Sequence, residues 1–268
     1  MKKIVISGAT SFLGYHTVKC FLDKGYQVYA LVRPHSKNIS NLTPHKNLKI
    51  IEFEFENPFA VINQIVSTDY FINFAWDSYG GRANDDVQIK NVEYSLKMLE
   101  LAKRLGAKKF IFPGSQAEYG QINGLICDNT VCSPVSAYGK AKLQFGSLGK
   151  KYATENGIDF IHLRIFSVYG YGDRPNTLVD YCIKSFLIGA TANLGCCLQK
   201  WNYLYVDDFA EIIEKLITAD VKTRIINIAS PDTKIMREFV KQIYEVIKCG
   251  NYTFENNILT ATVPVIFA

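Results

Sequence analysis

A tyrosine followed four residues later by a lysine is the pairing in this chain with the most direct chemical use. On a helix, residues i and i+4 share one face, so the ammonium favours the phenolate and lets the phenol exchange protons nearer neutral pH. Three such pairs occur: Tyr15/Lys19, Tyr138/Lys142 and Tyr244/Lys248. Their spacing is identical, so their surroundings must separate them.

Tyr138/Lys142 has the surroundings of a reactive site. The pair lies in "SAYGKAK", at the start of an expected helix that follows the strand "KFIFP" and the segment "GSQAEYG". In open α/β sheets ligands collect at the carboxyl ends of strands, which puts Ser115 at the edge of a cleft. We therefore predict Ser115, Tyr138 and Lys142 as catalytic residues. Core and surface roles explain the other two pairs.

Short apolar runs alternate with amphipathic stretches along the chain. We expect strands at 3–7, 27–32, 48–53, 70–75, 109–113, 158–166 and 224–229, and helices at 12–24, 84–105, 136–156, 207–219 and 234–248. Strands this apolar, separated by helices, indicate a parallel sheet covered on both faces. The predicted fold class is α/β, a doubly wound parallel sheet of the Rossmann type with a small C-terminal lobe.

The segment "SGATSFLG" follows the first expected strand and opens the first expected helix. Gly8 permits a sharp turn, Gly14 lets the helix pack on the sheet, and the amides at the helix N-terminus suit a phosphate. Ser11 stands where the middle glycine of a dinucleotide-binding turn is usual, and its hydroxyl can cap the helix or bond the pyrophosphate. We predict a dinucleotide site, with an ordinary strand-to-helix turn as the alternative.

The end of the second strand, "YALVRPHSKN", bears on the choice of cofactor. NAD-specific folds usually place an acidic residue there, but Val32 occupies that site and Arg33 follows it. An arginine with Ser36 and Lys37 nearby suits the additional phosphate of NADP. NADP (NADPH) is therefore favoured and NAD remains possible; a solvated basic turn is the alternative reading of Arg33.

These motifs resemble the extended short-chain dehydrogenase/reductases, the family of NAD(P)-dependent sugar-nucleotide epimerases, dehydratases and reductases. The resemblance runs through "SGATSFLG", "FINFAW", Asn91, "GSQAEYG", "YGKAK", "RIFSVYGYGDRP" and "YLYVDD", in that order. It implies that Ser115 orients the substrate oxygen and that Tyr138 is the general acid/base. It also implies that Lys142 lowers the tyrosine pKa and holds the nicotinamide ribose.

The resemblance further implies cofactor-binding residues on several loops. They are Gly8, Thr10, Ser11, Phe12, Leu13, Gly14, Arg33, Glu54, Phe55, Ala75, Asn91, Lys142 and Phe166. Glu54 and Phe55 match the adenine-side turn, where an aspartate is more usual, and Ala75 matches the small residue against the cofactor. Purely structural roles are the alternative, above all for Asn91 and Glu54.

The residues after Ser115 bear on the reaction. Gln116 and Ala117 fill the places where dehydratases of the family carry an acidic pair, and Glu118 should point away from the cleft if the segment is extended. We therefore predict reduction of a 4-keto (deoxy) sugar nucleotide by hydride transfer, with Tyr138 as general acid. The alternatives are an NDP-sugar 4-epimerase with bound NAD and a non-catalytic NADP(H)-binding sensor or scaffold.

The resemblance divides the chain into a cofactor domain and a substrate lobe. The NAD(P)-binding domain is expected at 1–166 plus 203–229, and the substrate-binding lobe at 167–202 plus 230–268. Relatives usually continue with further helices, so we expect a C-terminally shortened lobe. One alternative is that a partner subunit covers this lobe; the other is that the chain is truncated and its activity is impaired.

Predicted substrate-binding residues are Gln116, Ser167, Arg174 and Trp201. Ser167 stands where many relatives have an asparagine near the substrate diphosphate, which weakens a direct transfer of that role. Arg174 suits a nucleotide phosphate, with an ion pair to Asp173 or another acid as the alternative. Trp201 suits the sugar pocket, with packing inside the lobe as the alternative.

Composition indicates the kind of partner. The 268 residues are 48% hydrophobic and 21% charged, as in soluble globular proteins, and the formal charge of +5 is spread out, so no nucleic-acid or membrane partner is expected. The seven cysteines contain no CxxC motif, which predicts reduced thiols. The four histidines lack the spacing of metal ligands, so no metal is expected. We expect a cytoplasmic protein, because no signal peptide is apparent. By the resemblance, helices 84–105 and 136–156 would pair in a homodimer.

Overall fold

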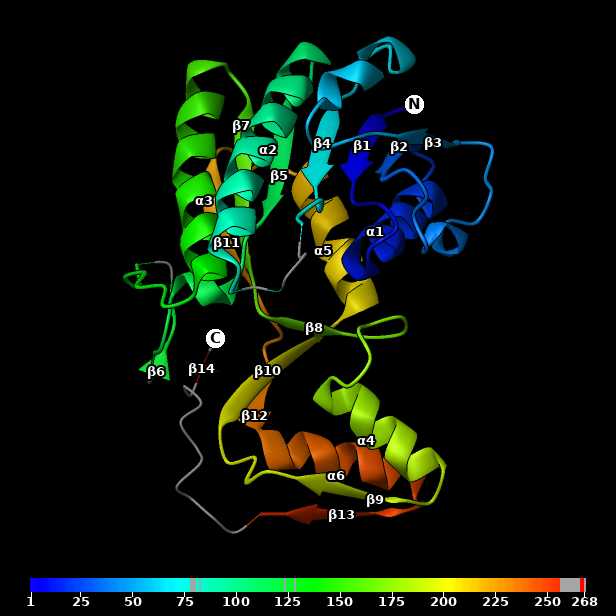
Figure 1. The fold of residues 1–268 in the computed structure, drawn as a ribbon, viewed down its shortest axis with the longest axis vertical. Helices are drawn as coiled ribbons and strands as arrows, with labels where there is room; N and C mark the ends of the chain where they lie inside the picture. The colour runs from blue at the N-terminus through cyan, green and yellow to red at the C-terminus, as the bar shows by residue number, and fades with distance from the viewer. Residues whose placement is uncertain (78–80, 82, 123, 128, 256–265, 268) are drawn as a thin grey trace. The chain divides into compact units, whose positions relative to one another are not determined.

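The structure is a computed structural model that describes residues 1–77, 81, 83–122, 124–127, 129–255 and 266–267. Its largest sheet is parallel (Figure 1). Among these residues the sheet has seven strands. In spatial order they are β11 (Arg224–Ile228), β7 (Asp159–Ile165), β5 (Lys109–Pro113), β4 (Tyr70–Asn73), β1 (Lys3–Ser7), β2 (Gln27–Val32) and β3 (Leu48–Glu52). The strand order reverses between β1 and β4, as in a doubly wound sheet. The predicted fold class is confirmed.

Two pairs of helices cover the faces of the sheet (Figure 1). The helix α1 (Phe12–Asp23) packs beside α5 (Val206–Thr218), and α2 (Asp85–Arg104) packs beside α3 (Ala137–Glu155). Polar residues start these helices: the side chains of Ser11, Asn84 and Ser136 accept backbone N–H groups of α1, α2 and α3. Three short 3₁₀ turns are η1 (Ile39–Asn41), η2 (Pro58–Gln64) and η3 (Gln116–Glu118).

Aromatic side chains fill the core between the sheet and α3. The rings of Phe110 and Phe160 on β5 and β7 stack with centroids 5.9 Å apart, and Phe112 meets Phe145 of α3 edge-on at 4.5 Å. All four side chains are almost completely buried. Such pairs add to the stability gained from their buried area. They hold α3 against the strand that ends at Pro113.

The chain divides into two compact units. The first comprises residues 1–120, 131–165 and 206–228, and it contains the large sheet and its four helices. The second comprises residues 121–130, 166–205 and 229–268. The segment 121–130 therefore belongs to the second unit, whereas the expected boundaries had kept it with the first.

Within its described residues, the second unit has two helices and several short strands. Its elements are β6 (Gly124–Leu125), β8 (Ser167–Tyr169), α4 (Leu178–Leu187), β9 (Thr191–Leu194), β10 (Lys200–Tyr205), β12 (Thr233–Ile235), α6 (Met236–Ile247), β13 (Asn251–Phe254) and β14 (Ile266–Phe267). Strand β10 pairs with β8 and β12, β13 pairs with β9, and β14 pairs with β6. Phe186 of α4 and Val240 of α6 are fully buried in the core of this unit.

A buried charged cluster ties the end of β5 to β7 in the first unit. The carboxylate of Glu118 is fully buried, and its Oε1 accepts the backbone N–H of Ser115 at 2.8 Å and lies 2.9 Å from Nε2 of His162. Its Oε2 accepts Nε of Arg164 at 3.1 Å. Burial opposes ionisation of Glu118, but the bonds to His162 and Ser115 and the charge of Arg164 outweigh it, so the pKa of Glu118 is lowered.

Glu118→Gln should destabilise the protein at neutral pH by about 3–5 kcal/mol, because it leaves the buried guanidinium of Arg164 without its counter-charge. The free energy of unfolding in urea measures this effect. Since the folded pKa of Glu118 is lowered, its contribution is present above the unfolded pKa of about 4.3 and is lost as the pH falls through the folded pKa. The difference between wild type and Glu118→Gln should therefore shrink towards pH 3.

Asp23→Asn provides the control, because Asp23 pairs with Lys19 across 2.8 Å on the exposed surface of α1. We expect this variant to change the free energy of unfolding by less than about 1 kcal/mol. Equal stability of Glu118→Gln and wild type at every pH would contradict the role assigned to the cluster.

Candidate active site

The carboxyl ends of β1 and β4 are joined at the point where the strand order reverses. The hydroxyl of Ser7 donates to Oδ1 of Asn73 at 2.6 Å, and the backbone N–H of Ala75 donates to the same hydroxyl at 3.3 Å. Gly8 has φ +63°, and a Cβ there would lie 2.8 Å from the backbone nitrogen of Ala75. Only glycine combines this φ with this close approach. The predicted residues Gly8 and Ala75 are thus brought together at the switch point, where doubly wound folds bind ligands.

The turn after β1 presents the N-terminus of α1. Ser11 is the N-cap, its Oγ accepting the N–H of Gly14 at 3.2 Å, which is one of the two roles foreseen for this serine. The first backbone bond of the helix runs from Tyr15 to the carbonyl of Ser11 at 2.9 Å, so the N–H groups of Phe12 and Leu13 precede the helical bonding pattern. Exposed donors at a helix start suit an anion, and the turn fits a dinucleotide pyrophosphate.

The loop after β2 meets the glycine turn. Oγ1 of Thr10 lies 3.1 Å from Oγ of Ser36, and the N–H of Ser36 donates to the carbonyl of Arg33 at 3.2 Å. Arg33 itself is exposed and forms no ion pair with another described residue. A guanidinium near the start of α1 can meet an additional phosphate on the cofactor.

Three other predicted cofactor residues, Glu54, Phe55 and Asn91, are either exposed or in contact with other side chains and backbone groups of the protein. Glu54 is exposed beyond the end of β3, and Phe55 stacks on Tyr94 with ring centroids 5.0 Å apart. Asn91 is buried, and its side chain accepts the N–H of Asp77 at 2.7 Å and donates to the carbonyl of Asp77 at 2.8 Å. Asn91 therefore fixes the segment that follows β4 and Ala75.

Ser115 begins the turn η3 at the carboxyl end of β5. Its Oγ accepts the N–H of Ala117 at 3.2 Å, and its own N–H is held by Glu118. The segment is a 3₁₀ turn rather than the extended stretch from which the orientation of Glu118 was predicted, but the carboxylate is still turned into the core. Gln116 is half-buried in this turn. The bond from Glu118 fixes the backbone of Ser115.

The first turns of α3 lie against η3. A Cβ on Gly139 would lie 2.3 Å from the carbonyl oxygen of Ala117, so glycine is needed for this approach. One turn along, the buried Lys142 donates from Nζ to the carbonyl of Pro113 at 2.7 Å, and Nζ lies 5.6 Å from the centre of the Tyr138 ring. The ammonium of Lys142 therefore stands at the end of β5, bonded to Pro113, which is two residues before Ser115 in the chain.

The other two tyrosine–lysine pairs differ in their surroundings. Lys19 forms a surface ion pair with Asp23. Tyr244 packs edge-on against Phe186 in the core of the second unit, and Lys248 ends α6 with a positive φ of 53°. These contacts agree with the core and surface roles predicted for them.

The sequence prediction missed one aromatic residue beside this group. The ammonium of Lys142 lies 3.6 Å from the centre of the Trp76 ring, and the edge of that ring meets Tyr138 with centroids 6.1 Å apart. Trp76 directly follows Ala75 in "FINFAW". Its position immediately after a predicted cofactor residue was the available signal.

The second unit contains the remaining predicted residues. The indole N–H of Trp201 donates to Oγ of Ser167 at 2.8 Å, so β10 and β8 bring these two together, and Trp201 also packs on the core of the unit. Arg174 is exposed, and its backbone N–H donates to the carboxylate of Asp173 at 2.7 Å. None of the ion pairs found among the described residues includes its guanidinium. Phe166 is buried.

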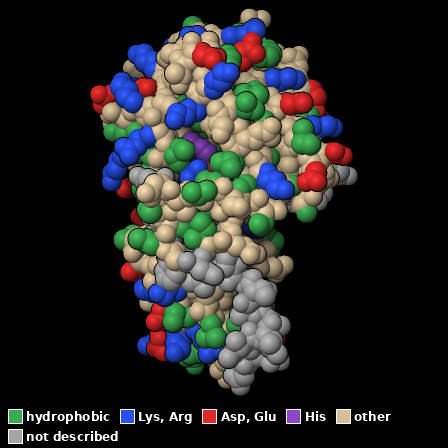
Figure 2. Space-filling view, turned by 90° about the vertical axis from the view of Figure 1, so that its left-hand side faces the viewer, with side chains coloured by type: hydrophobic (Ala, Val, Ile, Leu, Met, Phe, Trp, Pro, Cys, Tyr) green, Lys and Arg blue, Asp and Glu red, His purple; other side chains and the backbone are tan. Residues whose placement is uncertain are grey.

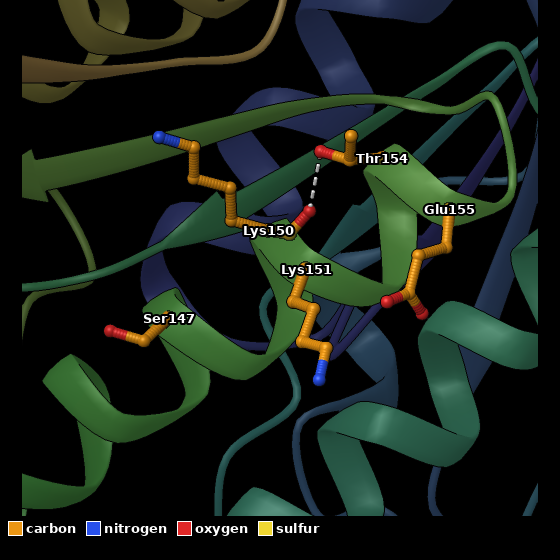
Figure 3. Close-up of a pocket in the computed structure, with 5 residues that line it drawn as sticks. All are labelled: Ser147, Lys150, Lys151, Thr154 and Glu155. Atoms are coloured by element: carbon orange, nitrogen blue, oxygen red, sulfur yellow. Dashed lines mark hydrogen bonds between the residues drawn. The ribbon is translucent and has the colours of Figure 1, made fainter.

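Figure 3 shows a surface hollow on α3. It is lined by Ser147, Lys150, Lys151, Thr154 and Glu155, and the hydroxyl of Thr154 donates to the carbonyl of Lys150 at 2.9 Å. The stretch begins nine residues after Tyr138 and five residues after Lys142, which is about 13 Å and about 7 Å along the helix. The hollow is thus separate from the tyrosine–lysine pair.

Neither a metal-ligand cluster nor a membrane-spanning helix is found in the described part of the chain. No group of three His, Cys, Asp or Glu side chains there is arranged to hold a metal ion. None of the helices in the described ranges has the length and hydropathy of a membrane span. On the face that Figure 2 shows, basic and acidic side chains are interspersed with apolar ones.

Relatives of the chain are recognisable by sequence. CDP-abequose synthase of Salmonella muenchen is 26% identical over 256 residues, which cover 92% of this chain and 80% of that protein. An uncharacterized UDP-glucose epimerase of Bacillus subtilis (strain 168) is 28% identical over 223 residues, which cover 77% of this chain and 69% of that protein.

A solved structure with the same fold is the UDP-N-acetylglucosamine 4-epimerase from Methanobrevibacter ruminantium M1 in complex with UDP-N-acetylmuramic acid. It has a TM-score of 0.85 at 24% identity, and the match covers 99% of this chain and 88% of that one. The sequence profile of the NAD dependent epimerase/dehydratase family matches residues 4–229, from β1 to the residue after β11. The chain therefore belongs to the NAD dependent epimerase/dehydratase family and is an enzyme of that type, within the extended short-chain dehydrogenase/reductases.

Proposed function

We propose that the protein reduces the keto group at C4 of a nucleotide-activated deoxy sugar, with NADPH as the reductant. The observation that carries this proposal is the buried ammonium of Lys142, which bonds the carbonyl of Pro113 two residues before Ser115 and lies 5.6 Å from the centre of the Tyr138 ring. A phenol, an ammonium and a hydroxyl in that position suit proton transfer to a carbonyl oxygen. The similarity to a CDP-abequose synthase supports a sugar nucleotide as substrate.

In this proposal each residue has one task. When bound, NADPH supplies the hydride that adds to C4 of the sugar. Ser115 donates a hydrogen bond to the keto oxygen and orients it, and Tyr138 transfers its phenolic proton to that oxygen as the alcohol forms. Lys142 stabilises the resulting phenolate and holds the nicotinamide ribose, and the phenol regains a proton from solvent.

The state of Glu118 argues against dehydration. An elimination needs an acid and a base beside the sugar carbons, and Gln116 and Ala117 carry neither. Glu118, the next acidic residue, is fully buried and bonded to Ser115, His162 and Arg164. Its carboxylate is therefore committed to the interior of the first unit.

A 4-epimerase with bound NAD is the second candidate. It would use the same three residues, and it is favoured by the similarity to a protein named as a UDP-glucose epimerase. The two candidates differ in the fate of the cofactor, because an epimerase keeps it bound while a reductase consumes NADPH in each cycle. Because the chain is an enzyme of this family, the non-catalytic sensor or scaffold is no longer a candidate.

The cofactor phosphate is assigned to Arg33. The guanidinium is exposed, and the Thr10–Ser36 contact joins its loop to the glycine turn. The N–H groups of Phe12 and Leu13, at the start of α1, would hold the pyrophosphate. An additional phosphate would bond Arg33, which gives NADPH the preference over NADH.

Gln116, Ser167, Arg174 and Trp201 remain the predicted substrate-binding residues. The hydrogen bond between Trp201 and Ser167 holds these two side chains together, which supports the proposal that both contact the sugar. The residues 167–202 and 230–268 accordingly remain the proposed substrate lobe. A homodimer through α2 and α3 and a cytoplasmic location also remain predictions.

Tyr138→Phe should lower kcat for a nucleoside diphosphate 4-keto-6-deoxy sugar by about a hundredfold or more, because the general acid is lost. Loss of NADPH absorbance on mixing enzyme and sugar measures the rate. Affinity for NADPH should stay within about threefold, since the ring remains. Tyr244→Phe, in the matched pair on α6, should leave kcat unchanged. A wild-type protein that consumes no NADPH with any sugar and nucleotide tried would contradict the reductase proposal.

Arg33→Met should weaken NADPH binding about tenfold to a hundredfold, the value of one charge-assisted hydrogen bond, and should leave NADH binding unchanged. The fluorescence of the bound reduced nicotinamide gives both dissociation constants. Arg224→Met removes another exposed arginine, at the start of β11, and should change neither constant. Equal losses for NADPH and NADH would show that Arg33 does not read the additional phosphate.

A further inference from the structure

Trp76 is the aromatic neighbour of the Lys142 ammonium that the proposed mechanism leaves without a task. The centre of its ring lies 3.6 Å from Nζ, closer than the rings of Phe112 at 4.9 Å and Tyr138 at 5.6 Å. A cation attracted to an aromatic face binds best on tryptophan, and most strongly where water is excluded. Lys142 is 4% exposed, so its contact with the indole is one of the stronger cation–π contacts, from which water is excluded.

The indole is itself held in place from α2. Its N–H donates to Oε1 of Gln88 at 2.9 Å, and Gln88 is 2% exposed. The ring also meets Tyr138 edge-on, with centroids 6.1 Å apart and planes at 84°. A ring fixed by a buried acceptor on one side and an aromatic neighbour on another presents its face to Lys142 in one orientation.

Fixing Lys142 matters because lysine is a flexible side chain. Its four-carbon stem loses much rotamer freedom when the ammonium is confined to one place, and burial removes its hydration. The carbonyl of Pro113 at 2.7 Å and the Trp76 ring offset these losses of rotamer freedom and hydration before any ligand binds. A ligand that bonds the ammonium then binds to a group that is already ordered.

We propose that Trp76 is a positioning residue, whose indole holds the Lys142 ammonium ready for the cofactor and so raises the affinity for the reduced nicotinamide dinucleotide. The inference rests on the proposed function in one respect, the role of Lys142 as the residue that holds the nicotinamide ribose. Trp76 acts through Lys142, and Gln88 acts through Trp76.

A double-mutant cycle on cofactor affinity tests this inference without any sugar substrate. The dissociation constant of NADPH is measured for wild type, Trp76→Leu, Lys142→Met and the double variant. Trp76→Leu should weaken binding about thirtyfold in the wild-type background, the value of a buried cation–π contact. In the Lys142→Met background the same change should weaken binding less than about twofold, because no ammonium remains to be held.

Two further variants separate positioning from packing. Trp76→Phe keeps an aromatic face and should restore affinity to within about threefold of wild type. Phe239→Leu removes a ring whose centre lies 5.9 Å from the ammonium of Lys234 in the second unit, and it should leave the affinity unchanged. An equal loss on Trp76→Leu in both backgrounds, or tighter binding, would overturn the inference while leaving the reductase proposal intact. A wild-type protein that binds neither NADPH nor NADH would overturn both.

Fluorescence gives a second measurement that does not depend on the cofactor or on the leucine variant. The chain has two tryptophans, so Trp201→Phe leaves the emission of Trp76 alone. Adding Lys142→Met should shift that emission, because it removes a charge from the face of the indole. An unchanged spectrum would show that the ammonium does not sit on the ring.

Discussion

The bond from the Lys142 ammonium to the carbonyl of Pro113, 2.7 Å long, joins the first turns of α3 to the carboxyl end of β5. The placing of the candidate site depends on this contact. Tyr138 stands one helical turn before Lys142, and Ser115 lies two residues after Pro113, so the one bond brings three separate chain positions to one place. The close approach of Gly139 to Ala117 and the edge-on contact of Phe112 with Phe145 support the same junction.

The sheet and its helices were predictable because their signals are local. Apolar runs such as "KIVIS" and "KFIFP" became β1 and β5 with the expected bounds, and the helix expected at 136–156 appeared as α3, Ala137–Glu155. The second unit was less predictable. Its helix α4 (Leu178–Leu187) was not foreseen, and the parallel pairing of β13 with β9 joins segments about 60 residues apart, which no local pattern indicates.

The candidate site was predictable in its residue types and less so in its supports. The choice of Tyr138/Lys142 over the other two pairs followed from the strand that precedes it. The engagement of Asn91 with the backbone of Asp77, the burial of Glu118 against His162 and Arg164, and the indole of Trp76 over Lys142 were not foreseen. Each depends on a partner from another strand or helix, brought near by tertiary packing.

The central claim is that hydride passes from NADPH to C4 of a sugar nucleotide and stays there. The direct measurement uses NADPH with deuterium at both C4 positions and a nucleoside diphosphate 4-keto-6-deoxy sugar, with the product examined by mass spectrometry and NMR. We expect one deuterium per product molecule, located at C4 of the sugar, and one NADPH consumed for each. A product formed without deuterium at C4, or sugar interconversion with no loss of NADPH, would contradict it.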